Sequence, residues 1–69
     1  MNIKTFENYS HAGTTYYLVQ FDFMPIENKL NILLAAFRFN GNYVGHTATF
    51  KTPNDREKYL TWITIKYGV

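Results

Sequence analysis

One stretch of the chain decides the fold, and it reads PIENKLNILLAAFRFNGNYVGHTATFK over residues 25–51. At its centre, Asn40-Gly41 separates two segments in which apolar and polar residues alternate. This dipeptide is the strongest short-range sign of a two-residue hairpin turn, because both turn positions need positive φ. The stretch therefore predicts two antiparallel strands, at about 30–40 and 43–51.

The first half of this stretch also fits a helix. Pro25 suits a helix start, and Leu, Ala, Lys and Glu are good helix formers. Five apolar residues follow helical spacing: Ile26, Leu30, Leu33, Leu34 and Phe37. The strand is favoured because a helix would leave only about four residues to pair with 43–51. Strand or helix for residues 25–37 stays an open choice.

The clearest helix signal follows this stretch. Thr52 suits the N-cap, Pro53 the first helical position and Asp55 the first turn, and Gly68 suits the helix end. The sequence predicts a helix at about 53–67. Its large apolar residues share one broad face, which needs a sheet to cover it: Tyr59, Leu60, Trp62, Ile63 and Tyr67.

Two further strands are expected upstream, at about 2–7 and 14–23, with a loop between them. The expected fold class is α+β. It has a single antiparallel sheet of three to four strands, with one C-terminal helix packed on one face. The expected core includes Val19, Phe21, Phe37, Phe50, Trp62 and Ile63.

Length and composition limit the kind of protein. The 69 residues are expected to form a single domain, 1–69. The sequence has no cysteine, so stability must come from packing and thiol chemistry is excluded. It shows neither a signal-peptide pattern nor an apolar run near the roughly 20 residues that span a bilayer. We expect a soluble protein of the cytoplasm, or of the host cytoplasm if phage-encoded, with no membrane partner.

Residues that could carry chemistry do not form a recognisable constellation. His11 is expected in a solvated loop and His46 in a partly buried position on the helix side. Neither has a second histidine or a carboxylate at ligand spacing, so no metal site is expected. No nucleophile elbow, phosphate-binding loop or triad order is visible either. We expect no catalytic residues and no cofactor, and hence a non-enzymatic binding protein.

The sheet face turned away from the helix is the expected binding surface. In the predicted register it combines aromatic, aliphatic and arginine side chains, which is typical of the centres of protein interfaces. The competing interpretation is an ordinary exposed sheet, since most folded surface is apolar anyway. Partner contacts are expected from Phe6, Tyr16, Arg38, Tyr43 and Lys51. The same face is expected to carry Leu18, Gln20, Asp22, Leu34, Thr47 and Thr49. A homodimer through this face is the simplest interface of this kind.

The arrangement resembles the small phage anti-CRISPR proteins, in particular the type I-F inhibitor built as an antiparallel sheet with helix on one side. The resemblance is carried by residues 2–6, by Asn40-Gly41 followed by Val44-Gly45, and by Phe50 followed by residues 52–62. That family occupies the backbone subunits of the crRNA-guided surveillance complex without catalysis. The resemblance therefore implies an inhibitor whose partner is a host protein or ribonucleoprotein complex.

The family's contact positions are matched in part. Phe6 stands at the position of its edge-strand tyrosine, Phe21 or Phe23 at that of its upstream aromatic residue, and Ala36 where it has an acid. Small phage inhibitors of bacterial RNA polymerase use a similar order of strands and helix. They are a further alternative for the target.

A second resemblance is to DNA readers with a three-stranded sheet, the plant AP2 domain and the arm-binding domains of phage and transposon integrases. It is carried by Tyr43-Val44-Gly45 through Phe50 and by Lys51-Thr52. Such domains lay the sheet in the major groove and read bases with arginine. The predicted face supplies only Arg38 and Lys51 as cations, and the net charge is only +2. Nucleic acid is therefore the second choice of partner.

Overall fold

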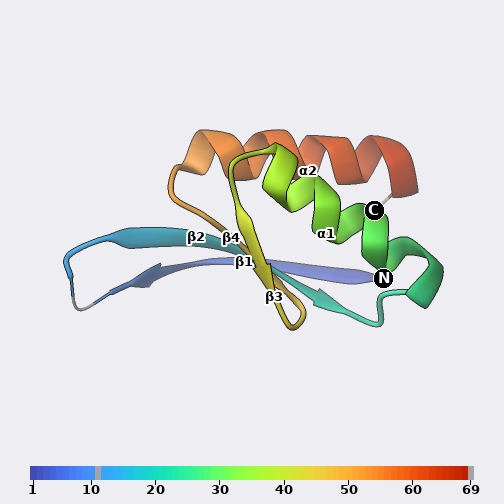
Figure 1. The fold of residues 1–69 in the computed structure, drawn as a ribbon, viewed down its shortest axis with the longest axis horizontal. Coiled ribbons are helices and arrows are strands. Elements are labelled where there is room, and N and C mark those ends of the chain that lie inside the picture. The colour runs from blue at the N-terminus through green and yellow to red at the C-terminus, as the bar shows by residue number, and fades with distance from the viewer. Residues whose placement is uncertain (11, 69) are drawn as a thin grey trace.

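The computed structural model describes residues 1–10 and 12–68. Within them the chain forms β1 (Asn2–Tyr9), β2 (Thr15–Asp22), α1 (Ile26–Arg38), β3 (Asn42–Val44), β4 (Thr47–Phe50) and α2 (Pro53–Tyr67). The strands form one antiparallel sheet in the order β1-β2-β4-β3, and both helices lie on the same side of it (Figure 1). The predicted α+β class, the antiparallel sheet and the C-terminal helix on one face are confirmed.

The strand predicted at 30–40 is wrong, because residues 30–38 lie in α1, a helix in addition to the predicted C-terminal one. α1 buries Ile32, Ala35 and Ala36 on one side. The argument for a strand fails because residues 42–50 pair with themselves. β3 and β4 form a hairpin across Gly45-His46, with Val44 opposite Thr47. The strand predicted at 43–51 is thus two short strands.

Asn40-Gly41 ends α1 instead of turning a hairpin. Asn40 has a φ of 64°. Its N–H donates to the carbonyl of Phe37 (3.2 Å), and the Gly41 N–H donates to the carbonyl of Ala36 (2.8 Å). These two bonds form a Schellman cap. A hairpin and a helix cap therefore share the same local sequence signal, a residue that tolerates positive φ.

α2 forms where the sequence predicts it. The Thr52 hydroxyl oxygen accepts from the Asp55 N–H at 3.2 Å, and Pro53 follows the cap. Gly68 ends the helix with a φ of 70°. A local signal at each end, without competing patterns, is the reason that both bounds could be predicted.

The core lies between the sheet and the two helices. Tyr59 of α2 is at its centre, with its ring centroid 5.0 Å from that of Phe50 and 6.2 Å from that of Phe21. Its hydroxyl donates to the carbonyl of Ile32 at 2.9 Å, which joins α2 to α1. Among the residues that the structure describes, the buried apolar ones are Val19, Phe21, Ile32, Ala35, Ala36, Tyr43, Ala48, Phe50, Tyr59 and Ile63.

Four of the six predicted core residues are buried as expected: Val19, Phe21, Phe50 and Ile63. Trp62 is only half-buried, with its ring against Tyr67. Phe37 is exposed, so its placement in the core is wrong. As part of a helix instead of a strand, its side chain points away from the sheet.

Candidate functional site

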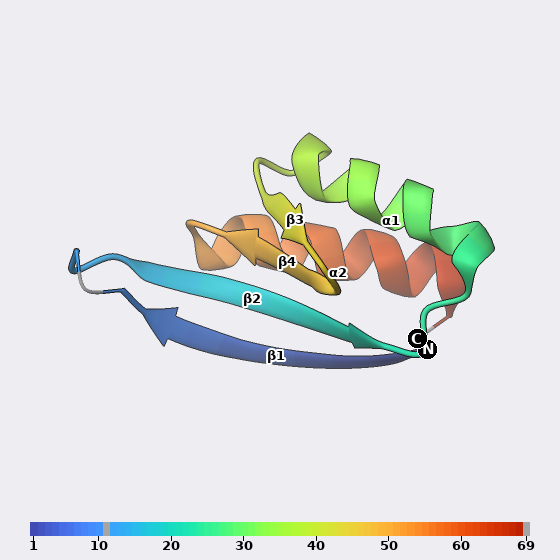
Figure 2. The same cartoon turned by 60° about the horizontal axis from the view of Figure 1, so that its bottom comes forward.

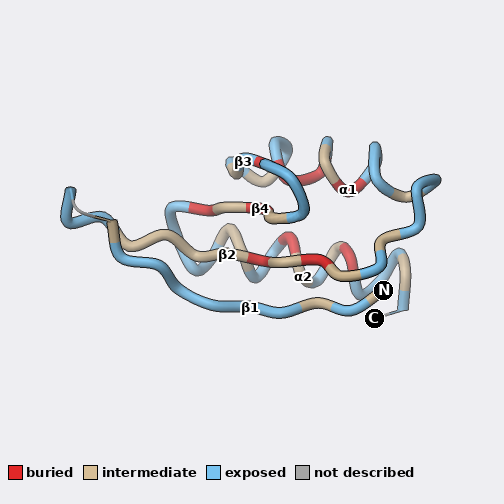
Figure 3. Tube along the Cα trace, turned by 90° about the horizontal axis from the view of Figure 1, so that it is seen from below, coloured by how far each residue is buried: buried red, intermediate tan, exposed pale blue. Residues whose placement is uncertain are grey.

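The sheet has one face without helices. In Figure 3 the molecule is seen from that side, with β1 exposed along most of its length. Val19, Phe21, Ala48 and Phe50 face the core, so the alternate positions face away from it. The open sheet face consists of these positions: Asn2, Lys4, Phe6, Asn8, Tyr16, Leu18, Gln20, Asp22, Asn42, Val44, Thr47 and Thr49.

Three of the five predicted contact residues lie on or beside the open sheet face. Phe6 is exposed on β1, opposite Leu18 and diagonal to Tyr16. Tyr16 is half-buried on β2. Lys51 follows β4 directly and is exposed. The predicted alternation of residues 14–23 places Tyr16 correctly, because β2 is a regular strand.

The other two predicted contacts lie elsewhere. Tyr43 is on the opposite face of β3, only 8% exposed, with its ring 6.2 Å from that of Phe21. Arg38 is in the last turn of α1, away from the sheet, and Leu34 is on the same helix. Placing these three residues on the open face is wrong. The register of a hairpin centred on Asn40-Gly41 does not apply to a helix followed by a shorter hairpin.

A shallow hollow of about 460 Å³ lies at one end of the open sheet face. Tyr16 and Lys51, which the sequence predicts from separate strands, both line it. The other lining residues are Asn40, Gly41, Asn42 and Thr49. The two asparagines were missed as candidates because they were assigned to a hairpin. The hollow thus offers a phenol, a cation, amides and a hydroxyl within one site.

The charge of the open sheet face is mixed. Two lysines, Lys4 and Lys51, lie on or beside this face. Lys4 Nζ lies 4.0 Å from an Asp22 carboxylate oxygen, so its charge faces an acid. Neither of the two arginines is on this face. Arg38 ends α1, and Arg56 belongs to α2 on the other side of the sheet. A face with this charge is suited to polar and apolar contacts more than to a phosphate backbone.

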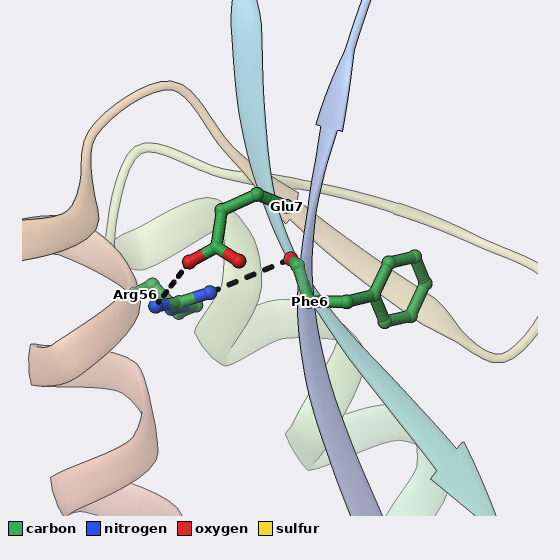
Figure 4. Close-up of polar contacts among 3 residues, drawn as sticks. All are labelled: Phe6, Glu7 and Arg56. Atoms are coloured by element: carbon green, nitrogen blue, oxygen red, sulfur yellow. Dashed lines mark hydrogen bonds and ion pairs between the residues drawn. The ribbon is translucent and has the colours of Figure 1, made fainter.

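Arg56 fixes the backbone behind Phe6 (Figure 4). Its guanidinium donates to the Phe6 carbonyl (3.4 Å) and to the Glu7 carboxylate (3.3 Å), and it lies over the Tyr17 ring at 5.4 Å from the centroid. The Phe6 ring is on the far side of β1 from Arg56. α2 therefore holds β1 in place while Phe6 stays free for contact.

Possible metal ligands do not cluster in the described part of the chain. Among residues 1–10 and 12–68, no three histidine or carboxylate side chains lie close enough to hold a metal ion. His46 is exposed in the β3–β4 turn, so its predicted half-buried place is wrong. His11 lies outside the described residues. Neither described helix combines the length and the apolar character needed to cross a membrane.

Comparisons of the chain with models of known protein families, with curated proteins and with solved structures found no match. Its function must therefore be inferred from the surface chemistry of the chain.

Proposed function

We propose that the chain is a non-enzymatic binding protein that occupies a protein surface with its open sheet face. The observation that supports this most is the continuity of one surface. Phe6, Leu18 and Tyr16 lie side by side, and Tyr16 and Lys51 then line the hollow. Aromatic and aliphatic groups with a cation at the edge are typical of interface centres. The core behind β2 and β4 keeps this surface rigid.

For the partner, we propose a host defence complex of the kind that anti-CRISPR proteins inhibit, in the cytoplasm of the host cell. The support is the resemblance of the edge strand, residues 2–6, and of Phe50 with the helix in residues 52–62. The part of the resemblance carried by Asn40-Gly41 is lost, because this dipeptide caps a helix. Host RNA polymerase is the alternative target. The chain would inhibit it in the same way, by occupying a protein surface.

The DNA-binding alternative has less support than the sequence suggested. Arg38 was one of its two cations, and it lies at the end of α1. Lys4 takes its place on the open sheet face, but it lies beside Asp22. Arginine or lysine to guanine is the commonest specific contact in the major groove, and both arginines lie in the helices instead of on this face.

The test is affinity capture from a bacterial lysate followed by mass spectrometry. Tyr16→Ala should raise the dissociation constant of the captured complex roughly tenfold or more, as for a central interface residue. The melting temperature should change little. Tyr9→Ala is the matched control, because Tyr9 is an exposed tyrosine of β1 outside the open sheet face, and it should leave capture unchanged.

Two results would contradict the proposal. Equal capture by Tyr16→Ala and by the wild type would exclude the open sheet face as the contact surface. Binding to duplex DNA, with a salt slope near −0.9 per phosphate contacted, would favour the DNA reader instead.

A further inference from the structure

α1 presents four of its six large apolar residues to solvent. Ile26 is 86% exposed, Leu30 65%, Leu34 55% and Phe37 51%. Their spacing of four, four and three residues places them along one side of the helix. These four residues are named the α1 stripe. The side of α1 that packs on the core carries Ile32, Ala35 and Ala36, with Leu33 partly buried beside them. The four exposed residues are therefore not needed to pack α1 on the core.

The α1 stripe faces away from the rest of the molecule. At 100° per residue, its mean direction is roughly 160° from that of Ile32, Ala35 and Ala36. In Figure 2, α1 lies over β3 at one side of the helix layer, and α2 packs on β2 and β4. Neither the sheet nor α2 covers the stripe, and the stripe is separate from the open sheet face.

Two opposite charges flank the stripe on the same side. Glu27 is in the first turn of α1 and Arg38 in the last. Their directions differ by only about 20° around the helix axis. Within the described part of the chain, the ion pairs are Lys4–Asp22 and Arg56–Glu7, so Glu27 and Arg38 have no internal partner.

We propose that the α1 stripe pairs with the same stripe of a second copy of the chain, with the two helices antiparallel. The two-fold axis lies between the two helices, perpendicular to both and at the level of residue 32. It brings one end of a helix flank against the other end of the same flank in the second copy. Ile26 then meets Phe37, and Leu30 meets Leu34. Glu27 of each copy meets Arg38 of the other, whereas parallel helices would put like charges at the same level.

The area fits a dimer of modest affinity. From the exposed fractions, the α1 stripe contributes on the order of 500 Å² per copy, hence roughly 1,000 Å² in the pair. This is near the lower limit of specific interfaces. We expect a dissociation constant of about 10⁻⁵ M. The open sheet face stays free in both copies, so the dimer does not depend on the proposed function.

Sedimentation equilibrium between about 5 and 500 µM tests the dimer. The wild type should follow a monomer–dimer equilibrium. Leu34→Lys should raise the dissociation constant roughly tenfold or more, because a charge would be buried without a partner. Ile65→Lys is the matched control, an exposed aliphatic residue of α2, and should change nothing. Circular dichroism checks that each variant is folded.

Charge reversal tests the antiparallel arrangement. Glu27→Arg and Arg38→Glu should each weaken the dimer several-fold, and the double variant should restore it. A wild type that stays monomeric at 500 µM would overturn the proposal, as would a dimer unaffected by Leu34→Lys. A dimer lost in Tyr16→Ala but kept in Leu34→Lys would place the contact on the sheet instead. Failure of the double variant to restore association would overturn the antiparallel geometry.

Discussion

At the scale of single residues, Tyr59 connects most of the core. Its ring packs among those of Phe21, Phe39 and Phe50, and its hydroxyl reaches the Ile32 carbonyl. Burial raises the pKa of Tyr59 well above that of a free tyrosine, with smaller contributions from Tyr43 and Tyr67. The native state therefore holds this phenol in its protonated form.

Alkaline pH should therefore destabilise the protein. The unfolded chain releases the Tyr59 proton near pH 10, while the folded chain keeps it to higher pH. The contribution of Tyr59 to the free energy of unfolding should be constant below pH 10. Above pH 10 it should fall by up to about 1.4 kcal/mol per pH unit. Urea denaturation at pH 8 to 11.5 measures the slope.

Tyr59→Phe should remove this part of the slope and cost about 1 kcal/mol at neutral pH for the lost hydrogen bond. Tyr43→Phe should remove a further part, because burial also raises the pKa of Tyr43. Slopes identical to that of the wild type in both variants would contradict this account.

At the scale of elements, the end of α1 decides how the chain enters the β3–β4 hairpin. Asn40 takes the left-handed conformation of the cap. Gly41 is needed for a different reason. A Cβ at this position would overlap the Phe50 ring and lie 2.9 Å from the Thr49 carbonyl oxygen. The cap therefore fits against β4 only if residue 41 has no side chain.

Substitutions at these two residues should have opposite effects. Asn40→Gly should stabilise the fold by roughly 0.5 kcal/mol, since glycine adopts positive φ without strain. Gly41→Ala should destabilise it by about 2 kcal/mol or more, because the fully buried Phe50 cannot move aside freely. Chemical denaturation compares them. A neutral Gly41→Ala would show that the cap does not pack on Phe50.

At the scale of the whole molecule, the β1–β2 hairpin extends beyond the helices and makes the fold elongated, with extents of 36 × 20 × 17 Å (Figure 1). β1 is an edge strand paired only with β2 in the described chain. The Arg56 side chain is largely buried between α2 and this hairpin. It is the polar link from the helix layer to the edge of the sheet.

Loss of Arg56 should loosen β1 more than the rest of the fold. Arg56→Ala should cost about 1–2 kcal/mol, because it removes the packing on Tyr17 and the bonds to Phe6 and Glu7. Hydrogen exchange should rise first in residues 2–9. Lys58→Ala, at an exposed position of α2, is the control and should be nearly neutral. Uniform exchange across the sheet in Arg56→Ala would contradict a local role.

The candidate site could be predicted only where the strands could. Tyr16 and Lys51 were placed correctly because β2 and the end of β4 follow a two-residue period. Phe6, expected from the family resemblance, lies on the same face because it is opposite Leu18. Arg38 and Tyr43 were misplaced together, because both positions depended on the hairpin turn assigned to Asn40-Gly41. Asn40 and Asn42 line the hollow because the cap of α1 leads directly into β3 beside β4. The sequence pattern does not show this arrangement.

The sequence by itself determined α2, β2 and the α+β class, because the caps at Thr52 and Gly68 and the alternation along β2 are local signals without a competing pattern. Only the tertiary structure decided that residues 26–38 form a helix instead of a strand. Their spacing suits strand and helix alike, and Asn40-Gly41 suits the end of either. The helix forms because Ile32, Ala35 and Ala36 pack on the core, while β4 pairs with β2 and with β3. That long-range pairing also turned the outer residues of α1 toward solvent, where the proposed dimer contact lies.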